Sequence, residues 1–278
     1  MFNIIKSDLY RLVRSIGFYV AIGIVILMAV INVLTIQAGR IGVSVGTSSV
    51  DITDAETISK INSAKSLGEF RDVMKSLGTF PLDKEIIGCN ANLYYIFIAF
   101  VAIILVKEFS NKSVKNTLSS AISRKKYYCS KLLFIVCLST LLILFNNYLN
   151  YFLNLIINGK EFASSIGEIT KLTIYQLPIL YGIICLLVCF AFIIRKGSIF
   201  NAISIPFFIV IQLIFTMITA LFRIKADWFT NYEFQYVLAN LTNNPTNAYI
   251  LKCSLLGISY MVIFGLIGYY AFKKAEIK

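Results

Sequence analysis

Six long apolar runs alternate with polar segments along the 278-residue chain. Each run is long enough for a helix to cross a hydrocarbon layer of about 30 Å. The runs occupy residues 17–36, 86–106, 132–157, 172–194, 198–222 and 250–272. The pattern therefore predicts an all-α integral membrane protein, a single domain with six transmembrane helices.

The second run is the most polar at its outer end. It reads GCNAN over Gly88–Asn92, and only Leu93–Val106 is strongly apolar. Because lipid offers amides no hydrogen-bonding partner, we expect Gly88–Asn92 to lie at the membrane interface or to face protein.

Residues 1–16 have an amphipathic pattern. Their large apolar residues share one helix face: Ile5, Leu9, Leu12, Val13 and Ile16. With three cations on the other sides, the segment predicts an interfacial helix on the inner leaflet, and a frayed flank is the alternative. We interpret the first apolar run as a retained span, since it is long for a signal peptide and no A-x-A-like site follows.

Two polar regions fall on the predicted outer side. Residues 37–85 are expected to form an extracellular loop that folds against the ends of the spans, because so short a segment with few large apolar residues cannot build its own core. Residues 226–249 contain YEFQYVLANL, which is too short to span. It predicts a helix that dips into the outer leaflet, with a surface loop as the alternative.

Composition and charge agree with this topology. Hydrophobic residues make up 58% of the chain, and the mean hydropathy is +0.78. With the N-terminus inside, 15 of the 26 basic residues lie on the cytoplasmic side, opposed only by Asp8, Glu108 and Glu276. The positive-inside rule therefore predicts that both termini are cytoplasmic, in a multi-pass protein of the plasma membrane. The basic balance indicates topology and not a nucleic-acid partner.

Several catalytic chemistries have no residues to carry them. The chain has no histidine, no Walker A pattern and no carboxylate within the predicted spans. We expect no ATP hydrolysis by this chain alone, no catalytic residue, no metal site and no ordinary proton coupling. The six cysteines lie mostly within or at the edges of spans, where packing accounts for them.

Uncharged polar residues recur inside two spans. Asn146, Asn150 and Asn154 share one face of the third span, and Gln212 and Thr216 lie in the fifth. Such residues either hydrogen-bond to neighbouring helices or line a polar translocation path, and the spacing alone allows both.

Residues 107–131 form a basic segment between the second and third spans. Read as a helix, they place Val114, Leu118 and Ile122 on one face, with Lys112 and Lys115 pointing elsewhere. The spacing predicts a short amphipathic helix with a face that can dock on another surface. The alternative is a plain cytoplasmic loop whose cations lie near anionic lipid.

The chain resembles the permease subunits of type-2 ABC exporters, and most of all those of bacitracin-type and lantibiotic-immunity exporters of Gram-positive bacteria. The likeness covers the whole chain, but it is motif-like only over Val106–Leu133. Glu108 and Phe109 match the family's acidic-aromatic pair. Ser113 stands for its threonine and Lys115 for its basic residue, whereas Lys112 replaces its glycine.

The resemblance implies a function and partners. The partners would be an ATP-binding subunit that holds ATP and Mg, a second permease in a homo- or heterodimer, membrane lipid and a peptide-like cargo such as a lantibiotic or bacitracin. Coupling to the ATPase would use a set of seven residues: Glu108, Phe109, Lys112, Val114, Lys115, Leu118 and Ile122. The apolar members would fill a groove of the ATPase, and the charged members would set the register.

Two alternatives remain at this point. One is a permease for another cargo, such as a lipid-linked glycan or a drug. The other is a non-transporting membrane protein that anchors or senses for a partner.

Overall fold

The computed structural model describes residues 2–37, 87–119, 122–157, 159–160, 163–222, 232–242 and 245–275. Every regular element in these ranges is helical, as the sequence predicts. The predicted 37–85 loop lies outside the described residues apart from Gln37.

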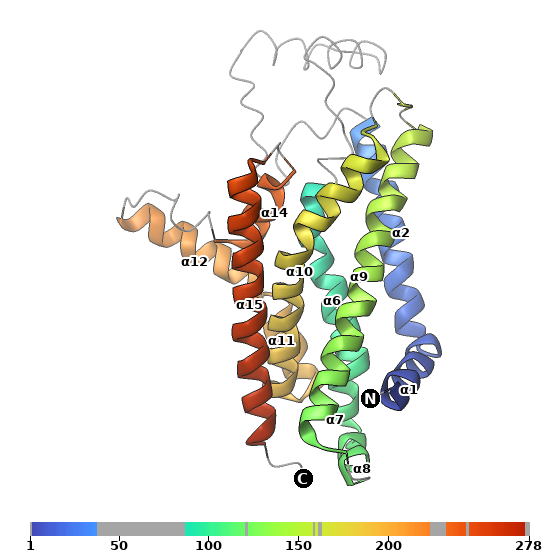
Figure 1. The fold of residues 1–278 in the computed structure, drawn as a ribbon, viewed down its shortest axis with the longest axis vertical. Coiled ribbons are helices and arrows are strands. Elements are labelled where there is room, and N and C mark those ends of the chain that lie inside the picture. Colours follow the sequence, from blue (N-terminus) through green and yellow to red (C-terminus); the bar gives the residue numbers. More distant parts are fainter. Residues whose placement is uncertain are drawn as a thin grey trace.

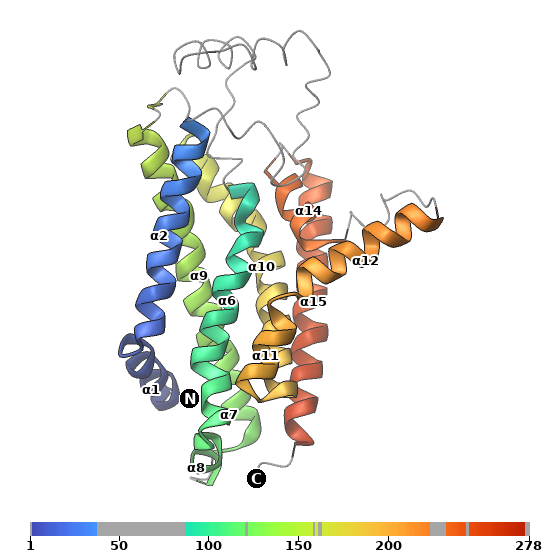
Figure 2. The ribbon, with the colours of Figure 1, turned by 180° about the vertical axis from the view of Figure 1, so that it is seen from behind.

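Five helical segments are long and apolar enough to cross a membrane, and they stand side by side in an elongated bundle (Figures 1 and 2). Four are single helices: α2 (Ile16–Gln37), α9 (Arg124–Ile157), α10 (Ile166–Ile194) and α15 (Asn247–Lys273). The fifth is a run of short helices: η1 (Cys89–Asn92), α6 (Leu93–Val101), η2 (Ala102–Val106) and α7 (Lys107–Ser110). Five of the six predicted spans are thus found as helices of this kind.

The fifth predicted span, residues 198–222, is wrong as a single continuous helix. The structure has α11 (Gly197–Ser204), a turn at Ile205 and Pro206, and then α12 (Phe207–Phe222). Proline has no N–H to donate to the preceding helical turn, so Pro206 interrupts the helical hydrogen bonding, although Ile205 keeps helical dihedral angles. Beyond this turn α12 leaves the bundle at a steep angle and projects sideways (Figures 1 and 2).

Helix α10 lies at the centre of the bundle. All residues from Gly182 to Cys189 are buried, so this stretch is covered on every side. It packs against α15 at very close range. A Cβ atom at Gly257 would lie 2.4 Å from the carbonyl carbon of Pro178, so only glycine permits this approach.

The predicted helix within residues 226–249 is found as α14 (Phe234–Asn240). The Glu233 side chain caps it by accepting a 2.7 Å hydrogen bond from the backbone N–H of Tyr236. Val237, Leu238 and Ala239 are buried, and α14 packs against η1 and α10. The depth of this helix in the membrane stays a prediction.

The N-terminal helix is also found, as α1 (Phe2–Val13), and it turns into α2 at Arg14 and Ser15. Its apolar residues divide between two surroundings. Ile5 and Leu12 pack on the core of the bundle, whereas Leu9 and Val13 are about half exposed. The helix therefore rests on the bundle with one side and keeps an apolar surface on another, which suits the predicted interfacial position.

Candidate functional site

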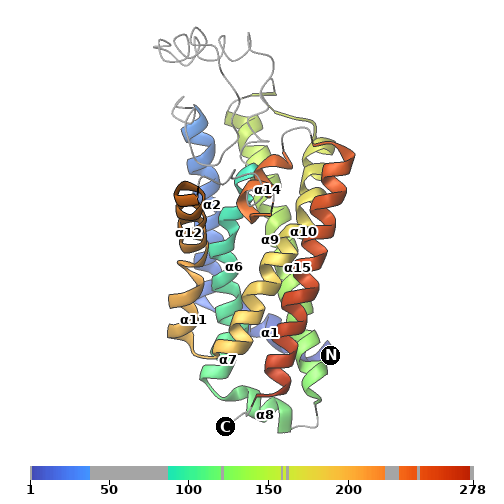
Figure 3. The ribbon, with the colours of Figure 1, turned by 90° about the vertical axis from the view of Figure 1, so that its left-hand side faces the viewer.

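The predicted coupling segment folds into two short helices at one end of the bundle. Helix α7 ends at Ser110, and α8 (Ser113–Ser119) follows after a tight turn. Figure 3 shows α8 at the end of the bundle where α15 also ends. The predicted amphipathic helix is present over α8, but Ile122 lies in a non-helical segment after it, and residues 120 and 121 lie outside the described part.

The turn between α7 and α8 depends on Lys112. This residue has a φ of +57°, in the left-handed region that glycine adopts most readily. Its backbone N–H donates to the carbonyl of Phe109 at 3.1 Å, and the Ser113 hydroxyl donates to the carbonyl of Glu108 at 3.3 Å. The conformation is one that glycine adopts at lower cost than lysine.

The apolar side of the segment is directed into the chain itself. Val114 is only 1% exposed and belongs to the core, and Leu118 and Ile122 pack against the same core. Phe109 is partly buried, with its ring centroid 5.6 Å from that of Phe192. This arrangement differs from the expectation that these residues fill a groove of a partner, because their apolar surface is already used within the bundle.

The two lysines of the predicted set behave differently. Lys112 and Lys115 are both exposed, at the end of the bundle that carries α8. They are therefore the members of the set that a partner protein can reach in this conformation.

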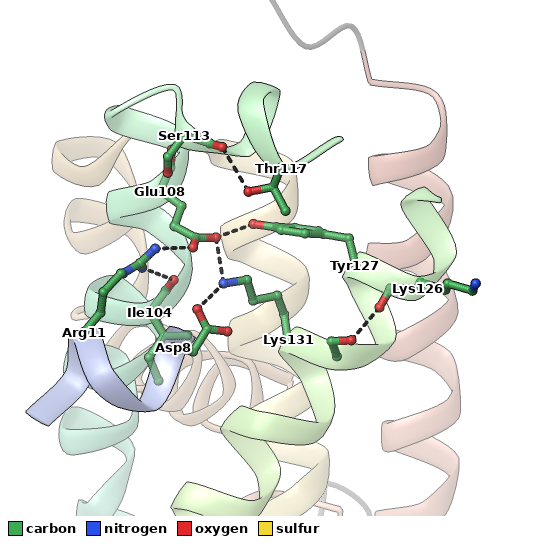
Figure 4. A network of polar contacts seen from close by, with 10 residues as sticks. Asp8, Arg11, Ile104, Glu108, Ser113, Thr117, Lys126, Tyr127 and Lys131 are labelled. Carbon is green, nitrogen blue, oxygen red and sulfur yellow. Dashed lines mark hydrogen bonds and ion pairs between the residues drawn. The ribbon is translucent and has the colours of Figure 1, made fainter. Parts of the chain in front are cut away.

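Of the predicted coupling residues, Glu108 differs most from the expectation of a docking surface, because it is buried. It is 6% exposed and lies in a cluster of charged groups contributed by α1, α7 and α9 (Figure 4). Its carboxylate accepts hydrogen bonds from the Arg11 guanidinium and the Tyr127 hydroxyl. The Lys131 ammonium lies 2.7 Å from Glu108 Oε2 and 2.6 Å from Asp8 Oδ1. Glu108 thus holds elements of its own chain together.

The charged cluster consists of Asp8, Arg11, Glu108, Tyr127 and Lys131. Its two carboxylates balance its two cations, and a buried charge is tolerated only when it is paired in this way. Arg11 also donates to the carbonyl of Ile104 in η2 at 3.3 Å. A π-helical stretch such as η2 frequently marks a functional position, and here it precedes the cluster directly.

Asp8 is the least satisfied member of the cluster. It is 2% exposed, and its Oδ2 atom accepts no hydrogen bond. Burial raises the pKa of this carboxyl above its ordinary value, and the nearby Lys131 ammonium offsets only part of that effect. The negative charge of Asp8 is therefore compensated less completely than the other charges of the cluster.

Sequence reasoning placed Arg11 and Lys131 among the inside cations. It missed that both of them pair with buried carboxylates. One signal was visible: Asp8 and Glu108 are two of only three acidic residues on the predicted cytoplasmic side. Rare acids in a basic region are candidates for specific ion pairs. The partners could not be assigned, because Lys131 and Asp8 are 123 positions apart in the chain.

The asparagines of the third span lie in a second polar network, near the opposite end of the bundle. Asn146 donates to Asn90 at 3.0 Å, Asn90 donates to Gln176 at 2.7 Å, and Asn150 donates to the carbonyl of Asn146 at 2.8 Å. Asn154 is fully buried. These contacts fit the helix-packing alternative, and the burial of Asn90 agrees with the expectation that Gly88–Asn92 faces protein.

The remaining candidates for a translocation path, Gln212 and Thr216, are positions of α12. Their side chains lie outside the described part of the structure. A role of either residue in a path therefore stays a prediction.

The part of the chain that the structure describes contains no candidate metal site. No group of three or more cysteine and carboxylate side chains comes together there. Cys185 and Cys189, which share a face of α10, are buried in the bundle, as packing residues would be.

Comparisons with known proteins add no relative. No family model, no curated protein and no solved structure matches this chain.

Proposed function

We propose that the chain is the membrane-spanning permease subunit of an ATP-driven ABC exporter in the plasma membrane of a Gram-positive bacterium. A separate ATP-binding subunit would hold ATP and Mg, and a second permease would complete the transport unit. The cargo would be a peptide antibiotic such as a lantibiotic or bacitracin, or a similar amphipathic compound.

The left-handed turn at Lys112 carries this proposal. A non-glycine residue in that conformation costs about 1 kcal/mol, so the surrounding structure must favour the turn. The turn falls where the resembled permeases have glycine, between the acidic-aromatic pair and the coupling helix. It leaves Lys112 and Lys115 exposed at the tip of the segment.

The charged cluster suggests how a push on α8 would travel. Helix α8 is joined to α7 by the Lys112 turn, and Glu108 in α7 is bound to Arg11 of α1 and Lys131 of α9. Movement of α8 would therefore shift three elements together. Such coupling requires that the ATP-bound partner contacts α8 differently in the two states of the transporter.

Within this proposal the coupling residues have two kinds of role. Lys112 and Lys115 would contact the ATPase, whereas Phe109, Val114, Leu118 and Ile122 would seat the segment on its own bundle. The asparagine network and the α12 positions Gln212 and Thr216 would border the path in an open state. Closed packing of Asn146, Asn150 and Asn154 would then be the resting arrangement.

The first test is purification of the tagged full chain from its native membrane in mild detergent. We expect an ATP-binding protein with a Walker A motif to co-purify. Lys115→Glu should reduce its yield at least about 10-fold, because charge reversal at an interface turns an attraction into a repulsion. Lys171→Glu, the same change on an exposed lysine of α10 near the other end of the bundle, should leave the yield unchanged.

Absence of an ATP-binding protein from the wild-type preparation would contradict the transport proposal and favour an anchoring or sensing role. If the complex is present, its ATPase rate should rise with lantibiotic or bacitracin-type peptides. A flat response to peptides combined with stimulation by a lipid-linked glycan or a drug would replace the cargo and keep the transporter.

A further inference from the structure

A cavity of about 510 Å³ lies between α1 and the η2–α7 segment, at the end of the bundle that carries α8. Tyr10, Arg11 and Arg14 line it from one side, and Ile103 and Lys107 line it from the other. Its volume lies within the range of about 300–1,000 Å³ that is usual for small-ligand sites. The proposed transport function leaves this cavity without a role.

The cavity has an excess of positive charge. Asp8 and Glu108 also border it, but Lys131 pairs with both, and Arg11 pairs with Glu108. Arg14 and Lys107 are exposed, and the ion pairs found here among the described residues use Arg11 and Lys131 instead. Two cations are therefore available to an anionic ligand.

Arg14 is held in position by its neighbour. Its guanidinium lies over the ring of Tyr10, with 4.6 Å between the guanidinium carbon and the ring centroid. Stacking of this kind restricts the long side chain, so less conformational entropy is lost when it binds a ligand. The hydroxyl of Ser15 and the amide of Asn111 add uncharged hydrogen-bond donors to the cavity wall.

The exposed apolar side of α1, which faces away from the cavity, indicates the depth of this helix in a membrane. Leu9, Val13 and Ile16 are 50%, 46% and 80% exposed on and just after α1. An amphipathic helix with such a surface lies at the boundary between headgroups and acyl chains. The cations of the cavity would then stand at the level of the lipid phosphates, with Ile103 on the acyl-chain side.

From the cavity, its two available cations and this position, we propose that the cavity binds the phosphate group of an anionic phospholipid of the inner leaflet. Arg14 and Lys107 would pair with the phosphate, and Ser15 and Asn111 would donate hydrogen bonds to it. Basic cavities at this depth are general binding places for anionic headgroups. A soluble phosphate ester has the same polar chemistry, and the test below includes one as a competitor.

The test measures lipid binding to the full chain by native mass spectrometry, with phosphatidylglycerol and phosphatidylcholine added to detergent-purified protein. We expect Arg14→Gln combined with Lys107→Gln to weaken phosphatidylglycerol binding about 30-fold, since each cation near an anionic surface gives roughly a fivefold effect. The matched control removes two exposed cations of α9, Lys125→Gln with Lys126→Gln, and should change binding less than threefold. Figure 4 shows the Lys126 side chain directed away from the cluster.

Three results would overturn the proposal. Equal weakening by both double variants would indicate attraction by the overall charge and not by this cavity. Equal binding of phosphatidylcholine and phosphatidylglycerol to the wild-type chain would remove the anionic headgroup as the ligand. Displacement of bound phosphatidylglycerol by millimolar glycerol 3-phosphate would identify a soluble phosphate ester. The wild-type measurements need no variant, so they decide even if the cavity variant does not fold.

Discussion

Lys131 differs from the other cations of its segment, although the sequence presents them as one basic run. Lys125 and Lys126 are exposed, whereas Lys131 is 1% exposed between two carboxylates. The positive-inside rule uses the number of cations near a span and carries no information on their partners. Its prediction of the membrane side therefore does not depend on whether a counted lysine is a structural residue.

We predict that Lys131→Met lowers stability by about 3–5 kcal/mol, because it leaves the buried Asp8 and part of the Glu108 charge uncompensated. The measurement is thermal unfolding of the detergent-purified chain. Lys126→Met, which shortens an exposed lysine five positions earlier, is expected to change stability by less than about 0.5 kcal/mol.

A further variant separates charge from packing. Asp8→Asn and Glu108→Gln added to Lys131→Met should recover part of the lost stability, because the carboxylates then need no counter-ion. No recovery would mean that Lys131 contributes through the packing of its side chain and not through its charge.

The long helices are the elements that the sequence predicts best. An apolar run reports the part of a helix that lies in hydrocarbon, and five such runs correspond to helical segments. Helix ends are less accessible, because a polar extension leaves no trace in hydropathy. Helix α9, for example, starts at Arg124, eight residues before its apolar run. The basic Arg124–Lys131 stretch therefore forms about two turns of helix α9 and is not a loop.

The break between α11 and α12 is a feature that the apolar pattern does not predict. The run 198–222 is as apolar as its neighbours, and Pro206 alone does not decide between a kinked span and two helices. The outcome depends on packing. Phe200 and Ser204 are buried in the bundle, whereas Ile209, Val210 and Leu213 on α12 are about half exposed. One sequence alone does not show which residues make these packing contacts.

We predict that Gly257→Ala destabilises the bundle by about 1–3 kcal/mol, as overpacking at a tight contact generally does. The added methyl group would collide with the Pro178 backbone, so α10 and α15 would have to separate. Gly265→Ala in the same helix is the control, because a Cβ there meets nothing within 4 Å. Thermal unfolding of the two purified variants gives the comparison, and equal melting temperatures would contradict the close approach.

The long helices run in the directions that six spans would give, although five helical segments of the described residues are long and apolar enough to span. Helices α2 and α9 run away from the end that carries α8, and α10 and α15 run toward it (Figures 1 and 2). The short α11 starts at that same end, and α14 lies near the other. The described helices α11 and α14 thus lie near opposite ends of the bundle, without a sixth long helix between them.

The directions of the helices lead to the last prediction, which concerns the side of the membrane on which the two ends of the chain lie. Because α1 and the last turn of α15 lie at the same end of the bundle, and that end carries Lys112, Lys115, Lys125 and Lys126, both ends are expected in the cytoplasm. Green fluorescent protein fused after Lys278 should fluoresce, and alkaline phosphatase fused there should be inactive. Phosphatase fused after Lys160, at the opposite end of the bundle, should be active. Active phosphatase at both positions would show that the segment from α11 to α14 does not cross the membrane, and the topology would then be one with five spans.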